Sequence, residues 1–142
     1  MRKPIYNIGQ NYLLRLPPGE DLLTGLYRVC REHAISFGVF QALGTVRSAT
    51  LGHLDQESGE VRRQVLSTGQ DLVHCSGNIS PQGDSFTIHA YATLSDAQGQ
   101  VSAGVLLAAE VYVIEVLIQE LQGRPQARNL DPETGLWLWS VT

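Results

Sequence analysis

Alternating apolar and polar positions run through most of the chain and predict β-strands. In residues 11–16, Tyr12, Leu14 and Leu16 share one face of an extended chain. Similar segments, separated by turns rich in Gly, Pro, Asp or Ser, predict strands over residues 61–67, 70–79, 85–94, 101–107, 110–121 and 136–141. The segment 36–54 contains spaced glycines and fits either one long strand or a bent strand pair. These short elements favour a mostly antiparallel sheet.

One segment has a helical period instead. Apolar residues recur there every three or four positions, at Leu22, Leu23, Leu26, Tyr27, Cys30 and Ala34. The spacing predicts an amphipathic helix over residues 20–33, with Glu20 and Asp21 in its first turn, where the helix dipole favours anions. The fold class is therefore α+β, with one principal amphipathic helix on a mostly antiparallel sheet. We expect residues 1–142 to form a single domain.

The segments 101–107 and 110–121 are the most apolar of the chain. Val116, Leu117 and Ile118 leave no polar face, so a strand here is buried on both sides, either between helix and sheet or at a subunit interface. Charged residues make up 17% of the chain, below the usual level of about 25%, which also favours self-association. We expect a homo-oligomer. A membrane span is not expected, because Glu110 and Glu115 interrupt the segment.

Charge and cysteine content restrict the function classes. The net charge is -4 and the chain contains one lysine, whereas binding to phosphate backbones depends on clustered Lys and Arg. Cys30 and Cys75 lack metal-ligand spacing, and nothing at the N-terminus resembles a signal peptide. We therefore expect a cytoplasmic protein in which both thiols are reduced and packed.

Five short motifs occur in an order that resembles one known family. They are Leu-Pro-Pro-Gly-Glu-Asp-Leu at 16–22, Ala-Leu-Gly-Thr-Val at 42–46, Asp-Leu-Val-His-Cys-Ser-Gly-Asn-Ile at 71–79, His-Ala-Tyr-Ala-Thr-Leu-Ser-Asp at 89–96, and Asp-Pro-Glu-Thr-Gly-Leu-Trp-Leu-Trp at 131–139. This order resembles the PPC domain, which plants and prokaryotes share. The resemblance implies a stand-alone bacterial type of PPC protein that forms a homotrimer. In plants the domain follows AT-hook DNA-binding motifs, and in bacteria it has no settled activity.

The resemblance also implies a metal site that this sequence does not reproduce. Many bacterial members carry an H-x-H strand motif and a later G-G-H-L, which together suggest three histidine ligands. Here the first motif is Thr87-Ile88-His89 and the second is Ala103-Gly104-Val105-Leu106. One imidazole of three remains, and an alkyl side chain replaces another. We expect no metal and no other cofactor.

The remaining polar residues suggest a ligand site instead. The candidates are His89, Thr87, Gly44, Thr45, His74 and Arg128. If the loop after Ile79 closes symmetrically, position 74 faces position 91, and His74 lies diagonal to His89 on one face. Backbone N–H groups at Gly44 and Thr45 suit an anion, although a bend in a strand explains the glycine equally well. Arg128 is a candidate anion contact. We expect any pocket to lie near His89, between subunits.

Three functions follow from these observations. The leading hypothesis is a metal-free, homotrimeric assembly or small-ligand-binding module, whose ligand is a small or anionic molecule. The second is a DNA-associated regulator, which is disfavoured because the hook-like segment Gln122-Gly123-Arg124-Pro125 lacks the first Arg of Arg-Gly-Arg-Pro. The third is a metal-independent enzyme that uses His89 as general acid or base.

Overall fold

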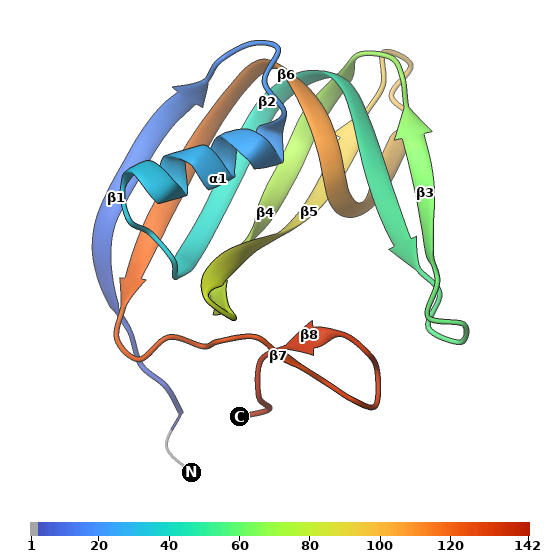
Figure 1. The fold of residues 1–142 in the computed structure, drawn as a ribbon. Coiled ribbons are helices and arrows are strands. Elements are labelled where there is room, and N and C mark those ends of the chain that lie inside the picture. The colour runs from blue at the N-terminus through green and yellow to red at the C-terminus, as the bar shows by residue number, and fades with distance from the viewer. Residues whose placement is uncertain (1–2) are drawn as a thin grey trace.

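The computed structural model describes residues 3–142 and has one helix packed on a strongly curved sheet (Figure 1). A short C-terminal hairpin lies below the sheet in this view. In chain order the elements are β1 (Asn7–Leu16), α1 (Leu22–Glu32), β2 (Gly38–Leu54), β3 (Val61–Leu66), β4 (Gln70–Gln82), β5 (Ser85–Ser95), β6 (Val101–Gln122), β7 (Asn129–Leu130) and β8 (Trp137–Leu138). The predicted α+β class, with a mostly antiparallel sheet and one helix, is confirmed. The helix of the described residues is too short to span a membrane.

The long strand β6 organises the sheet. Its first part pairs with β5, and its later part lies between β1 and β2, all antiparallel. The sheet order is β1-β6-β5-β4-β2-β3, and the additional pairing of β6 with β2 curls it into a closed arrangement. The predicted segments 101–107 and 110–121 are thus one bent strand, and segment 36–54 is one strand, not a pair. Register shifts between β2 and β6 allow this bending without a break.

The helix starts two residues later than the sequence pattern predicts. Asp21 is the N-cap: one carboxylate oxygen accepts a hydrogen bond from the Thr24 backbone N–H at 3.0 Å. The other oxygen accepts the Ala109 backbone N–H at 2.9 Å and so fastens the helix to β6. Glu20 lies before the helix and pairs with Arg28 at 2.9 Å. Both acids therefore precede the first turn, and Asp21 serves as its cap.

Replacing Asp21 with alanine removes the cap and the helix–sheet bond together. We expect Asp21→Ala to lower the free energy of unfolding by about 2 kcal/mol, measured by urea denaturation. Asp55→Ala is the matched control, because Asp55 also accepts two backbone N–H groups but in an exposed turn; its expected loss is about 0.5 kcal/mol. Equal losses in the two variants would contradict a special role for the bond to Ala109.

The core lies between α1 and the concave face of the sheet. Leu22, Leu26 and Cys30 of the helix and Val116 and Ile118 of β6 are at most 1% exposed. Cys30 and Cys75 are both free and buried, as predicted, and burial raises the pKa of these thiols to about 11 and about 12. They are therefore packing residues with little thiolate at neutral pH.

The C-terminal strand is shorter than predicted. Of the segment 136–141, only Trp137 and Leu138 form strand pairs, with Leu130 and Asn129. The next residue, Trp139, instead donates a hydrogen bond from its indole N–H to Ser80 Oγ in β4, at 2.9 Å. This contact directs the chain away from a strand path and places the tail against the β4–β5 hairpin.

Candidate functional site

The β4–β5 hairpin carries His89, and its register differs from the prediction. His89 faces Asn78, and Tyr91 faces Ser76. Symmetric closure of the 80–84 loop predicts position 74 opposite 91, which is wrong by two residues. The turn contains only Gly83 and Asp84, so both strands extend through the segment that the sequence pattern assigns to a loop.

The new register separates the two histidines. His74 faces Thr93, four positions along β5 from His89 and thus roughly 13 Å away at the usual strand rise. Its Nε2 lies 3.0 Å from Ser76 Oγ. His74 and His89 share a face of the sheet, but the structure does not bring them together.

Gly44 and Thr45 lie at the other end of the sheet. Gly44 pairs with Leu72 at a bulge between β2 and β4, with φ of 136°, and a Cβ there would overlap the Val113 carbonyl oxygen. This close approach of two backbones accounts for the glycine without an anion. The expected pocket joining His89 to the Gly44 segment is therefore not formed within this chain.

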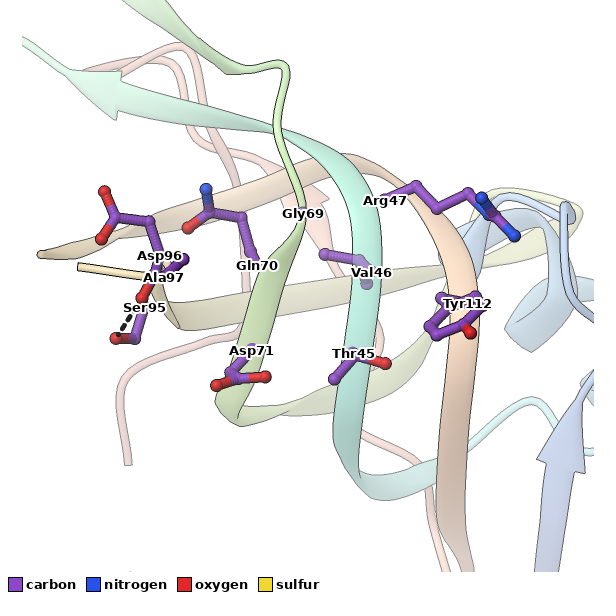
Figure 2. Close-up of a pocket in the computed structure, with 10 residues that line it drawn as sticks. All are labelled: Thr45, Val46, Arg47, Gly69, Gln70, Asp71, Ser95, Asp96, Ala97 and Tyr112. Atoms are coloured by element: carbon purple, nitrogen blue, oxygen red, sulfur yellow. Dashed lines mark hydrogen bonds between the residues drawn. The ribbon is translucent and has the colours of Figure 1, made fainter. Parts of the chain in front are cut away.

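Thr45 instead lines a shallow groove of about 460 Å³. Figure 2 shows Arg47 and Tyr112 on one side and Asp71 and Asp96 on the other. The Arg47 guanidinium lies 4.7 Å from the centre of the Tyr112 ring. The groove has acidic and basic side chains, and its buried polar residue, Gln70, donates its amide N–H groups to Thr68. It remains a second, weaker candidate.

Thr87 lies two residues before His89, and its hydroxyl contacts a side chain of the helix α1. Its Oγ1 is 3.3 Å from Tyr27 Oη, which in turn accepts the Ile88 backbone N–H at 2.9 Å. Thr87 therefore joins the hairpin to α1. Its hydroxyl is half-buried and close in sequence to His89, so it borders the His89 surface without forming its centre.

Arg128 is fixed beneath the hairpin by neutral groups. Its Nη2 donates to Asn78 Oδ1 at 2.7 Å, and its Nη1 donates to the Trp137 carbonyl oxygen at 3.3 Å. The guanidinium lies 4.9 Å from the centre of the Trp139 ring. The side chain is 7% exposed, and its Nε has no hydrogen-bond partner within residues 3–142.

The positive charge of Arg128 affects the pKa of His89. The pKa of His89 is lowered from its ordinary value, first by burial and second by the nearby Arg128 cation. Burial also lowers the pKa of Arg128, and Tyr91 opposes that effect. At neutral pH His89 is therefore mostly uncharged and can donate one ring N–H. His89, Tyr91, Asn78 and Arg128 form the cluster that we call the hairpin site.

Three residues in or beside the hairpin site are missing from the candidates that the sequence suggests: Asn78, Tyr91 and Trp139. Strand alternation places Tyr91 on the same face as His89, so the sequence pattern is sufficient to predict that Tyr91 belongs to this site. The roles of Asn78 and Trp139 depend on the tail folding back over β4, which no local pattern reveals.

The three-histidine metal site does not fit these residues. Val105 faces Tyr91 across β5 and β6 and has no donor atom, while the Thr87 hydroxyl contacts Tyr27. Over residues 3–142, no group of three or more His, Cys, Asp or Glu side chains is placed to hold a metal ion. His89 alone remains of the motif, and a single imidazole cannot form the three-ligand site that the motif implies.

The fold defines an α+β domain in which one helix covers a curved antiparallel sheet. The sequence profile of the Plants and Prokaryotes Conserved (PCC) domain matches residues 4–122. The chain therefore belongs to this family, and the resemblance to the PPC domain is confirmed. The tail that contains Arg128 and Trp139 lies outside the matched range.

Solved structures agree with this assignment over the whole chain. The metal-containing protein AF0104 from Archaeoglobus fulgidus is 33% identical, with a TM-score of 0.92, over 99% of this chain and 100% of that one. A plant- and prokaryote-conserved (PPC) protein from Pyrococcus horikoshii is 30% identical, with a TM-score of 0.94, over 100% and 99% of the two chains.

A curated relative is much longer than this chain. The bifunctional protein GlmU from Synechococcus sp. (strain JA-2-3B'a(2-13)) is 32% identical over 127 residues, which cover 87% of this chain. The match spans 19% of that relative's length. The similarity therefore concerns one part of the relative.

Proposed function

We propose that this chain works as a homotrimeric PPC-domain module that binds a small ligand and lacks the three-histidine metal site. The observation that carries the proposal is the exposed apolar character of one sheet face. This surface, which we call the outer face, is the side of the sheet turned away from α1. Its large apolar side chains include Leu13 (82% exposed), Val39 (38%), Leu43 (58%) and Tyr91 (60%).

Strand pairing places these residues on one continuous surface. Leu13 of β1 faces Leu117 of β6, which also faces Gln41 of β2. Leu43 lies two residues along β2 on the same face, opposite Glu115. In β6, Val116 and Ile118 are buried toward the helix, whereas Leu117 points outward and is only half-buried. A second copy of the chain would cover this outward side.

Native mass spectrometry with metal analysis tests the proposal. We expect a species of about 47 kDa, three times the 15.6 kDa chain, with no stoichiometric zinc after purification without chelators. A stable monomer at micromolar concentration would contradict the trimer. Zinc at one ion per chain would contradict the metal-free site and would require ligands other than Thr87 and Val105.

A DNA-associated function is the alternative from another class. Two solved structures of the same fold, at 18% and 23% identity, have names that describe them as candidate DNA-binding proteins. The net charge of -4 opposes DNA binding. Arg128 is buried, so it cannot form a positively charged surface patch together with Arg124. Salt-sensitive binding of duplex DNA at physiological ionic strength, lost in Arg124→Ala, would establish it.

Catalysis by His89 is the third candidate. The lowered pKa keeps the imidazole uncharged near neutral pH, which suits a general base. Among the described residues no acidic side chain pairs with the ring to hold it in one tautomer. An activity that disappears in His89→Ala while the oligomer stays intact would establish this function.

A further inference from the structure

The unusual feature of the hairpin site is a buried cation without an acidic partner. In residues 3–142 the ion pairs involve Arg28 with Glu20 and Glu32, and none involves Arg128. The hydrogen-bond partners of Arg128 are an amide oxygen and a backbone carbonyl, both neutral. Buried arginines normally have a carboxylate partner, because an uncompensated charge in a low-dielectric environment is costly.

Exposed hydrogen-bond donors lie next to this charge. His89 faces Asn78, which Arg128 contacts directly, so the imidazole and the guanidinium meet at the same pair of strands. Tyr91 lies two residues along β5 on the same face and is 60% exposed. A ring N–H and a phenol O–H therefore border a surface with a fixed positive charge beneath it.

We propose that the hairpin site binds a small oxyanion, a carboxylate or phosphate group, which accepts hydrogen bonds from His89 and Tyr91 above the buried Arg128. This inference deepens the proposed ligand-binding function and rests on it. Arg128 acts through its charge and is held by Asn78 and Trp139, so it need not be exposed. Arg128 thus places a positive charge close to His89, the one histidine of the three-histidine motif that this chain retains.

The second copy of the chain could supply a carboxylate in place of a free anion, and the test distinguishes these two sources. Inorganic phosphate and acetate are titrated separately into the purified protein. NMR follows the chemical shifts of the His89 ring, and calorimetry measures the heat of binding. We expect saturable binding at one anion per chain, with a change at His89. The anion that binds with the lower dissociation constant identifies the preferred group.

Three variants locate the site. Arg128→Met should weaken binding at least about tenfold, the loss expected for a charge-assisted contact. Tyr91→Phe removes one hydroxyl from an exposed side chain and should weaken binding about threefold to tenfold without affecting the tail. Arg63→Met, which removes an exposed arginine on the edge strand β3, outside both candidate sites, should bind like the wild type.

Several outcomes would overturn the inference. Equal binding by the wild type, Arg128→Met and Tyr91→Phe would indicate an adventitious ion only. If Tyr91→Phe binds the anion like the wild type while Arg128→Met binds it more weakly, the site does not lie on this face of β5. Dissociation of the oligomer in Arg128→Met would show that a partner's carboxylate neutralises Arg128. Mass measurement of the same samples separates the two proposals: a trimer without anion binding contradicts this inference alone, and a monomer that binds phosphate contradicts the trimer alone.

Discussion

Replacing Gly77 with alanine is expected to cost more than about 3 kcal/mol of folding free energy. Gly77 lies inside β4, between β2 and β5, and pairs with Ala90. A Cβ at this position would overlap the His89 carbonyl oxygen and would lie 2.9 Å from the Phe40 ring. A backbone oxygen cannot rotate away as a side chain can, so the two strands would have to separate.

Chemical denaturation monitored by tryptophan fluorescence measures this loss. Gly69→Ala is the matched control: Gly69 lies in the same part of the chain, and an added Cβ there would meet only the Val46 carbonyl oxygen at 3.9 Å. We expect that control to change stability by less than about 0.5 kcal/mol. A loss below about 1 kcal/mol in Gly77→Ala would mean that β4 and β5 can move apart easily, contrary to the close pairing of these two strands.

The same variant also affects the hairpin site. Asn78 follows Gly77 directly and holds Arg128 at 2.7 Å. Any separation of β4 from β5 moves Asn78 relative to His89, because these two residues face each other. A surviving folded fraction of Gly77→Ala should therefore bind anions more weakly than the wild type, although the change lies outside the site.

The elements of this fold were largely predictable because its strands and helix have strong local patterns. The helix face from Leu22 to Cys30 and the alternation in β1 each depend on residues close in sequence, and the sequence pattern predicts both. The predicted start of α1 is two residues too early, because the acids that favour a first turn also favour the cap position, which Asp21 occupies. The sequence pattern predicts two strands in place of β6 because Ala108 and Ala109 interrupt the run of large apolar residues.

The candidate site was less predictable because it depends on contacts distant in sequence. The hairpin register follows from a two-residue turn, and the shift of two positions puts His74 opposite Thr93 instead of position 91 and puts Asn78 opposite His89. Arg128 was a candidate from its place before the Asp131 turn, but its burial depends on Asn78, 50 residues away, and on Trp139. Such contacts form only when the tail packs on the finished sheet.

Introducing a charge on the outer face is expected to dissociate the proposed trimer. Leu43 is 58% exposed in the single chain and lies opposite Glu115. In a trimer covering this face, Leu43→Asp would bury a carboxylate beside another carboxylate, which costs several kcal/mol, so we expect the association constant to fall by more than about a hundredfold. Sedimentation velocity at micromolar concentration should then show a monomer.

A control at equal exposure makes this result specific to the outer face. Val61 of the edge strand β3 is also 58% exposed, and it pairs with Leu54 at the end of β2 opposite to the Leu43 end. Val61→Asp adds the same charge, so the trimer should persist if β3 lies outside the interface. A trimer that survives Leu43→Asp but dissociates in Val61→Asp would place the contact at the β3 edge. The hairpin site would then lie open to solvent, because nothing would cover Tyr91 and His89 from a neighbouring copy.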